Sequence, residues 1–379
     1  MGYITSLAFS PTNAILAVGR GVGSMFLWSP AEAEHRFIRV PLPAAATYVS
    51  FRPKPIRRQS QRQNAALGYN AFLADNEVLL VGHDSGAVSI YFVEWPAQRD
   101  RDLYNWHGSV AICATLMLHS QQICGISWSD DGDLFAVGSN DNSCSLYESK
   151  AIFQLDAEEA TDATDLSNTA GEQSSLWSAR LQFHESATAR VRARQIWRIH
   201  AAVKAIAFCP WQSGLLAIGG GSNDRGIHFF HTLSGACLAT IDCAAQVTSL
   251  IWSRRRKEIA ATFGFSQPDH PFRIAVYTWP DCRQIVAIPW QDELRALYAI
   301  PYPGGPSMSL GSGEGESGWC TRTAEEGCIV VARSDGSIKF HEIWRGTKTS
   351  SGSSSGLLGG SDILESLHGI DKEGPDTIR

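Results

Sequence analysis

The residues best able to do chemistry in this chain are its glycine runs, histidines and cysteines. Gly19 to Gly23 and Gly219 to Gly221 have the composition of phosphate-binding loops. Neither opens a helix or carries the Lys-Ser/Thr pair of a P-loop, so we do not expect nucleotide binding. The 11 histidines form no recognisable catalytic triad, and the nine cysteines lack the spacing of a zinc site. The sequence therefore predicts no enzyme, no metal site and no cofactor.

The overall composition excludes further classes of protein. The 379 residues carry a formal net charge of -6, whereas a general nucleic-acid or membrane-surface binder normally has a basic excess. No apolar run reaches the roughly 18 residues of a bilayer span, and the N-terminus lacks a signal-peptide pattern. Cys144 and Cys237 fall in predicted strands, which favours buried free thiols in a reducing compartment. We expect a soluble protein of the nucleus and cytoplasm.

Three short motifs allow both a binding role and a structural role. The segment from Cys209 to Gln212 is either a site or a turn whose tryptophan packs between repeats, and we favour the turn. Asp224 with Arg225 either recognises a ligand or, as we favour, makes hydrogen bonds within a tight turn. The basic cluster from Arg254 to Lys257 is either a solvated hairpin turn, which we favour, or a nuclear-localisation element or acidic-partner patch.

The elements that would position these residues are short strands, seen most clearly from Ala202 to Gln267. Apolar residues alternate along this run with the period of two that half-buried strands show. The pattern that begins at Val203 restarts at Val247, a spacing within the roughly 40–45-residue period of four-stranded propeller blades. Three turn-rich segments divide the run into four short strands. These segments are Pro210–Gly214, Gly219–Asp224 and Leu233–Gly235. One blade cannot bury both of its faces, so the rest of the chain should supply its neighbours.

Similar strand starts recur along the chain, each followed by a turn. They are Ile4–Pro11, Tyr48–Pro53, Ile123–Ser129, Val203–Pro210, Val247–Ser253 and, more weakly, Leu294–Pro301. Most precede a second strand that runs into glycine and a third that ends on an aromatic residue. The sequence therefore predicts an all-β fold, a β-propeller with six visible blades over residues 1–346.

Irregular segments fall between the predicted strands. The basic stretch from Lys54 to Asn70 interrupts the second unit. The acidic, Ser/Thr/Ala-rich stretch at 156–188 is predicted to be a disordered insertion, and the Gly/Ser-rich stretch at 304–318 a surface loop. Residues 347–379 are predicted to form a flexible C-terminal tail.

Strand direction predicts where the polar loops gather. In an antiparallel four-stranded blade, the loop between the second and third strands emerges at the same face as the segment that leads into the first strand. Asn140 with Asp141, Ser222 to Asp224, and Ala245 with Gln246 should therefore converge around one mouth of the central channel. Loops on a rigid scaffold commonly form a binding surface.

Several motifs together resemble one family. In order, they are Ile123–Ser129, Gly138–Asn142, Cys209–Gln212, Gly219–Arg225, Ser234–Cys237, Gln246–Ser253, Lys257–Ile259 and Gly264–Gln267. Their order and spacing resemble the Fizzy-type WD-repeat coactivators of the anaphase-promoting complex, from about His119 to Gln267 and apart from the acidic insertion. The chain also ends in Ile378-Arg379, similar to the tail by which this family docks on the ligase.

The resemblance implies a function and a site. Fizzy-type coactivators are not enzymes: their propeller captures degrons in substrates, such as cyclins or other cell-cycle regulators, and presents them to a ubiquitin ligase. The positions that match the family's receptor for Lys-Glu-Asn (KEN) degrons are Asn140, Ser222, Gln246 and Lys339. Relatives often have threonine in place of Ser222 and arginine in place of Lys339, and lysine lacks the planar fork of arginine.

Two departures from the family pattern stand out. The family has seven blades behind an N-terminal ligase-activating arm, whereas this chain begins inside a first strand, so we expect the arm and the first blade to be missing. Relatives carry an acidic pair where this chain has Asp335-Gly336, which weakens the expected contact with a destruction-box degron. The long insertions suggest a divergent branch, such as the fungal meiosis-specific coactivators. The alternative function is a scaffold outside the ligase, or a regulatory decoy.

Overall fold

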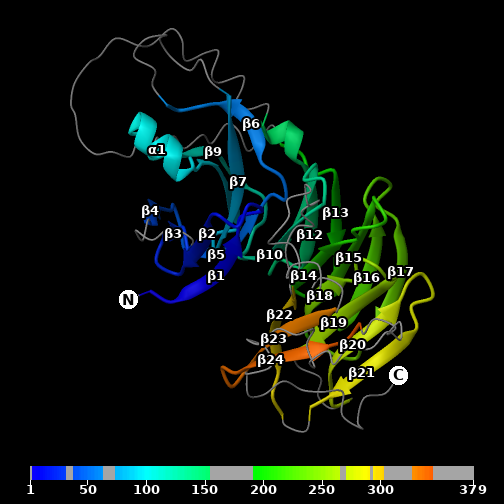
Figure 1. Cartoon of the computed structure of the whole chain (residues 1–379). Coiled ribbons are helices and arrows are strands. Elements are labelled where there is room, and N and C mark those ends of the chain that lie inside the picture. The colour runs from blue at the N-terminus through cyan, green and yellow to red at the C-terminus, as the bar shows by residue number, and fades with distance from the viewer. Residues whose placement is uncertain are drawn as a thin grey trace. The chain divides into compact units, whose positions relative to one another are not determined.

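The computed structural model of the chain describes residues 2–30, 37–62, 73–153, 191–264, 270–290, 293–302 and 327–344. The chain divides into two compact units, Met1–Arg198 and Ile199–Arg379. In the described residues each unit holds three antiparallel sheets (Figure 1). The acidic insertion at 156–188, the loop at 304–318 and the tail at 347–379 lie outside the described residues.

The first unit contains three sheets in chain order. The first sheet has strands β1 (Ile4–Phe9), β2 (Leu16–Arg20), β3 (Ser24–Trp28) and β4 (Phe37–Pro41). The second has β5 (Ala46–Phe51), β7 (Leu73–His83), β8 (Ala87–Glu94) and β9 (Ser109–Met117), and the third has β10 (Ile123–Trp128), β11 (Leu134–Ser139), β12 (Ser143–Glu148) and β13 (Gln195–Arg198). The first strands β1, β5 and β10 pack side by side, as inner strands of neighbouring blades do.

The second unit repeats this arrangement. Its fourth sheet has β14 (Val203–Phe208), β15 (Leu215–Gly220), β16 (Gly226–His231) and β17 (Cys237–Asp242). The fifth has β18 (Val247–Trp252), β19 (Glu258–Phe263), β20 (Phe272–Thr278) and β21 (Gln284–Pro289), and the described part of the sixth has β22 (Ala296–Tyr302), β23 (Cys328–Arg333) and β24 (Ile338–Glu342). The first strands β14, β18 and β22 again lie side by side. The prediction of an all-β propeller with six visible blades is confirmed.

A shared irregularity shows that the six sheets repeat one design. In every sheet the pairing of the first strand with the second skips one residue near the start of the first strand. The skipped residues are Thr5, Thr47, Cys124, Lys204, Thr248 and Leu297. Such a bulge redirects the side chain of the extra residue. Each blade therefore has one redirected side chain at the equivalent position of its first strand.

The described part of the basic stretch from Lys54 to Asn70 comes between the first and second strands of its blade, as predicted, but it contains a strand rather than being irregular throughout. Strand β6 (Ile56–Gln59) pairs with the extended N-terminal half of β7, and a short helix α1 (Gln98–Tyr104) follows β8 (Figure 1). The Arg58 guanidinium lies 3.9 Å from the centre of the Phe92 ring. The hydroxyl of Ser60 donates to the buried carboxylate of Glu94 at 2.6 Å. These contacts give a polar segment a fixed place in the blade.

Aromatic side chains join the fourth and fifth sheets. The indole N–H of Trp211 donates to the carbonyl oxygen of Ser253 at 2.9 Å, and the Trp211 ring meets Trp252 edge-on. The indole of Trp252 in turn donates to the carbonyl oxygen of Ala207 at 3.1 Å. The predicted packing of the Cys209–Gln212 turn between blades is thus confirmed. Such paired burial of rings and N–H groups is the normal use of tryptophan in a core.

The cysteines are only partly as predicted. Cys144, Cys209, Cys243 and Cys328 are buried free thiols, and burial raises the pKa of Cys243 to about 12. Cys237 is exposed, so the prediction that it is buried was wrong. It lies on β17, the outermost strand of its sheet, where most side chains face solvent.

Candidate functional site

The polar loops predicted to form a site lie at the equivalent end of each blade, taken blade by blade. In each blade the backbone N–H of a residue just after the second strand donates to the carbonyl oxygen of a residue just before the first. The pairs are Gly21–Tyr3, Asp84–Ala45, Asn140–Gln122, Gly221–Ala202, Gly264–Gln246 and Ser334–Arg295, at 2.9 to 3.2 Å. The predicted sharing of one face by these two segments is therefore confirmed blade by blade. Convergence of Asn140 and Ser222 on one mouth involves both units and stays a prediction.

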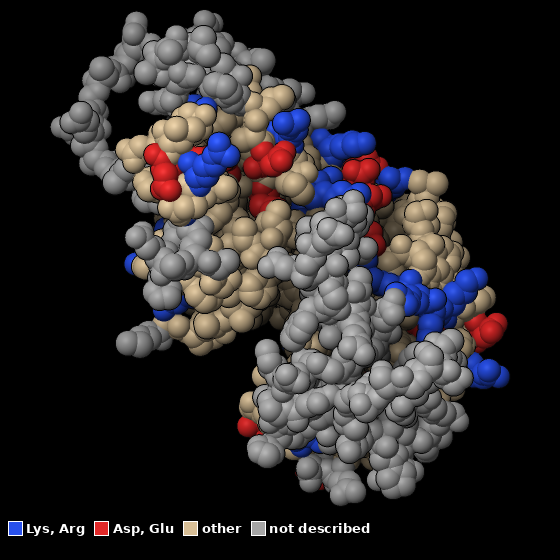
Figure 2. All heavy atoms as spheres, in the orientation of Figure 1, with Lys and Arg blue, Asp and Glu red and all other residues tan. Residues whose placement is uncertain are grey.

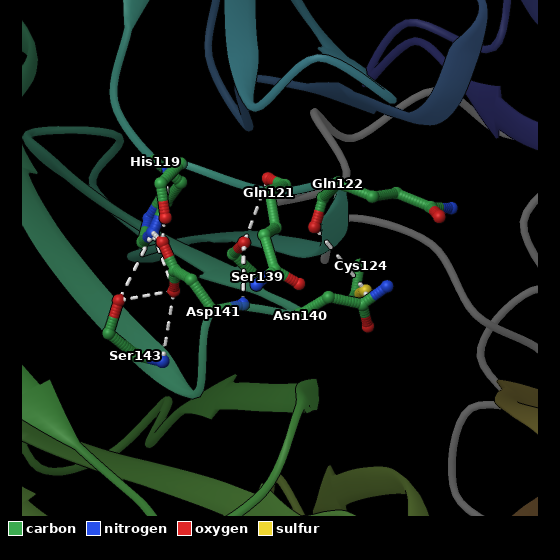
Figure 3. A network of polar contacts seen from close by, with 9 residues as sticks. His119, Gln121, Gln122, Cys124, Ser139, Asn140, Asp141 and Ser143 are labelled. Carbon is green, nitrogen blue, oxygen red and sulfur yellow. Dashed lines mark hydrogen bonds and ion pairs between the residues drawn. The ribbon is translucent and has the colours of Figure 1, made fainter.

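Asn140 lies on the turn between β11 and β12 with an exposed side chain. The next residue, Asp141, anchors this turn (Figure 3). Its carboxylate accepts hydrogen bonds from the hydroxyl of Ser143 at 2.5 Å and from the backbone N–H groups of Ser120 and Ser143 at 3.1 Å. The buried His119 ring places Nδ1 3.0 Å from the same carboxylate. The exposed amide of Asn140 therefore lies on a turn in which the next residue, Asp141, is fixed by its contacts in the blade.

The electrostatics of Asp141 follow from these contacts. Burial alone would raise the pKa of this carboxyl group, but the hydrogen bonds from Ser143 and Ser120 and the nearby His119 outweigh burial and lower the pKa below its ordinary value. Asp141 is therefore a carboxylate at neutral pH. Its carboxylate bonds to groups of the protein itself, whereas the side chain of Asn140 is exposed to solvent.

Ser222 lies on the turn between β15 and β16 and is exposed. The carboxylate of Asp224 closes this turn: it accepts from the backbone N–H of Gly226 at 3.1 Å and pairs with Nε2 of His228 at 2.7 Å. A Cβ on Gly220 would fall 1.9 Å from that carboxylate, so a side chain there would have to displace Asp224. The structural role favoured for Asp224 is confirmed. Gly219 and Gly220 end β15, and Gly221 begins the turn that carries Ser222.

Gln246 immediately precedes β18 and is half-buried. A Cβ on Gly219, at the end of β15, would come within 2.5 Å of the Cγ1 atom of Val247. The end of β15 therefore touches the start of β18, and the turn that carries Ser222 lies at the same end of the neighbouring blade as Gln246. Two of the four predicted receptor residues thus belong to adjacent blade ends within one unit.

Lys339 differs from the other three because it lies within a strand, β24, rather than on a turn. It is half-buried, and its ammonium nitrogen lies 5.8 Å from the centre of the Trp290 ring. An aromatic face attracts a cation and holds the side chain in place. Ile378 and Arg379 lie outside the described residues, so the docking role predicted for them remains a prediction.

Other chemical possibilities can be compared with the described residues. Among them, no group of three or more His, Cys, Asp or Glu side chains is arranged to hold a metal ion, and no helix has the length and apolar character to cross a bilayer. The cluster from Arg254 to Lys257 forms the turn between β18 and β19, as favoured. Figure 2 shows Lys and Arg atoms beside Asp and Glu atoms on the visible face.

Sequence reasoning missed one contact in the site. The thiol of Cys124 lies 3.0 Å from the side-chain oxygen of Asn140. The signal was indirect, because Cys124 is the skipped residue of the third blade and only the register of β10 with β11 reveals this.

Comparisons with known proteins agree with this geometry. Residues 111–148 match the family model described as "WD domain, G-beta repeat". The chain is 29% identical to the meiosis-specific APC/C activator protein AMA1 of Saccharomyces cerevisiae, over 99% of this chain and 54% of that protein. It is 29% identical to meiotic fizzy-related protein 2 of Schizosaccharomyces pombe, over 90% of this chain and 52% of that protein. In the crystal structure of the Mitotic Checkpoint Complex, one protein chain superposes with a TM-score of 0.57 and 26% identity, covering 90% of this chain and 75% of that one.

The repeated sheets and the matched repeat define a WD-repeat β-propeller protein. More particularly, the chain is homologous to the Fizzy-type activators of the anaphase-promoting complex, and two of these relatives carry meiotic names. The resemblance predicted from the sequence is confirmed. The chain spans about half the length of the curated relatives it matches.

Proposed function

We propose that the chain is the substrate-recruiting propeller of a coactivator of the anaphase-promoting complex, acting in cell-cycle control in the nucleus and cytoplasm. The similarity to a meiosis-specific APC/C activator and to a meiotic fizzy-related protein, over at least 90% of the chain, is the observation that carries this proposal. In this role the chain binds and presents substrates rather than catalysing a reaction. Its partners are subunits of the ligase and degron-bearing regulators of the cell cycle, with a meiotic role suggested by the named relatives.

The degron would bind at the loop ends of the blades. Asn140 and Ser222 are exposed polar side chains on anchored turns, Gln246 lies beside the Ser222 turn, and Lys339 supplies a positive charge. An extended polar peptide needs hydrogen-bond donors and acceptors of this kind more than it needs an apolar pocket. Pre-organised turns reduce the entropy lost when these groups are ordered by the peptide.

The experiment that tests the site is titration of the full chain with a peptide containing Lys-Glu-Asn. Asn140→Ala should weaken binding by about 1–3 kcal/mol, because peptide polar groups would lose their partner. Asn142→Gly is the matched control: it removes another exposed amide of the same turn, and glycine tolerates the left-handed backbone at this position, where φ is 65°. Unchanged affinity of the Asn140→Ala variant would reject this site.

The docking role is tested separately at the C-terminus. Deletion of Ile378 and Arg379 should weaken capture of the ligase in a pulldown and leave the affinity for the Lys-Glu-Asn peptide unchanged. A chain that binds the peptide but captures the ligase equally well with and without these two residues would show that the docking assignment is wrong. A chain that binds the peptide and never captures the ligase would instead be a decoy.

A further inference from the structure

The thiol of Cys124 contacts the side chain of Asn140 (Figure 3). The sulfur atom lies 3.0 Å from the Oδ1 atom of Asn140. Cys124 is the skipped residue where β10 pairs with β11, with Ile123 opposite Ser139 and Gly125 opposite Gly138. The bulge therefore turns the cysteine side chain toward the loop end of the blade. The backbone N–H of Asn140 is fixed at the same time by the carbonyl oxygen of Gln122, at 3.0 Å.

The chemistry of this pair fixes the direction of the amide. A thiol has one weak hydrogen-bond donor, and an amide oxygen is a good acceptor, so the S–H group pairs with Oδ1 of Asn140. The carbonyl oxygen of Gln122 is a more distant acceptor for the same thiol, at 3.6 Å. With Oδ1 bonded to the S–H group, the two hydrogens on Nδ2 are the part of this exposed amide that remains for a bound peptide.

We propose that Cys124 is a positioning residue that makes Asn140 a hydrogen-bond donor in peptide recognition. The amide then selects an acceptor on the bound peptide, such as a backbone or side-chain carbonyl oxygen or a carboxylate. This inference rests on the proposed function, because it assumes that the peptide binds at Asn140. It adds that Asn140 is the hydrogen-bond donor in the contact with the peptide. It also adds Cys124, which was not among the predicted receptor residues.

The experiment uses the full chain and titration with the Lys-Glu-Asn peptide. Cys124→Ala removes the S–H donor and should weaken binding about 2- to 5-fold, in the lower range for one hydrogen bond. Cys124→Ser restores a donor in the same place and should bind within about twofold of the native chain. Cys237→Ala is the control for loss of a thiol, since Cys237 is exposed on an outermost strand. A purely structural effect of Cys124→Ala would not be corrected selectively by a hydroxyl.

Substitution at Asn140 gives a second readout that does not disturb the bulge. Asn140→Asp replaces the two N–H donors with an oxygen, so it should weaken binding as much as Asn140→Ala does. An aspartate variant that binds as tightly as the native chain would overturn the donor assignment, as would equal binding by the native, Cys124→Ala and Cys124→Ser chains. If the Asn140→Ala variant binds the peptide as tightly as the native chain, the proposed peptide site itself is wrong. Failure of the peptide site is thereby distinguished from failure of the donor assignment alone.

Discussion

Replacing Asp141 with alanine should strongly destabilise the third blade. The Asp141 side chain is 15% exposed and joins the β11–β12 turn to the buried ring of His119. Its carboxylate accepts from Nδ1 of His119, from the hydroxyl and N–H of Ser143, and from the N–H of Ser120. Alanine removes all of these acceptor sites at once. The His119 ring is only 1% exposed, so water cannot readily replace the carboxylate there.

The magnitude follows from what each donor loses. A buried donor left without its acceptor costs about 1–3 kcal/mol, and this applies in full to His119. The donors on Ser120 and Ser143 lie near the surface and recover part of their loss by bonding to water, so they add less than the usual 1.5–3 kcal/mol of a bond to a charged group. The free energy of unfolding should therefore fall by about 3–5 kcal/mol, the range found when one partner of a buried pair is removed. Asp141→Asn keeps one acceptor oxygen and should cost about half as much.

Urea denaturation followed by tryptophan fluorescence measures this loss. The matched control is Asp335→Ala in the equivalent turn of the sixth blade, where Asp335 also accepts from the N–H and hydroxyl of a serine two residues on. Asp335 is exposed and holds no buried histidine among the described residues, so its removal should leave the urea midpoint nearly unchanged. An Asp141→Ala chain within about 1 kcal/mol of the native stability would refute the reasoning.

The pH dependence provides an independent check on Asp141. Its folded-state pKa is lowered, so the carboxylate stabilises the fold above the unfolded-state pKa of about 3.9. That contribution is lost as the pH falls from this value through the lower folded-state pKa. The stability difference between the native chain and Asp141→Asn should therefore be largest near neutral pH and shrink below about pH 4. A difference that stays constant to lower pH would exclude the charge as its source.

Two other predictions concern the first unit. Gly86→Ala should destabilise the chain more than Gly336→Ala in urea denaturation. Both glycines have a positive φ, of 89° and 83°, so the backbone strain of alanine is similar at the two positions. A Cβ on Gly86 would lie 2.2 Å from the carbonyl oxygen of His119, whereas a Cβ on Gly336 would meet no atom within 4 Å. Equal losses would contradict the steric argument. Burial raises the pKa of Glu77 despite the hydrogen bond from Thr12, so stability should fall as the pH rises from the unfolded to the folded pKa. Glu77→Gln should remove this fall, and its stability relative to the native chain should be highest above the raised pKa.

The strands could be predicted from the sequence because each blade repeats the same alternation of apolar and polar residues between turn signals. The strand β6 was missed because Ile56–Gln59 is polar, and it becomes a strand only because β7 extends beyond the blade and offers an edge for pairing. The exposure of Cys237 was missed for a related reason. Apolar character alone cannot distinguish the outermost strand β17 from the buried strands inside the same sheet.

The candidate site was predictable at the level of blade ends but not of side-chain contacts. Strand direction alone placed Asn140 and Gln246 at their blade ends, since antiparallel connectivity leaves no alternative. The contact of Cys124 with Asn140 depends on a one-residue bulge that moves the cysteine out of simple alternation. A register shift of this kind is set by tertiary pairing, so no local pattern in the sequence reveals it.

The anchoring of the turns differs between blades, and this difference bears on recognition. The acidic side chain that closes the turn is 15% exposed at Asp141 and 7% at Asp224, but 37% at Asp335. A turn closed by a buried carboxylate loses little further freedom when a ligand binds, whereas a turn closed at the surface must be ordered by the ligand itself. Asn140 and Ser222 lie on turns of the first kind. Of these three turns, the β23–β24 turn, which carries Gly336, is therefore the one where a peptide contact would be weakest.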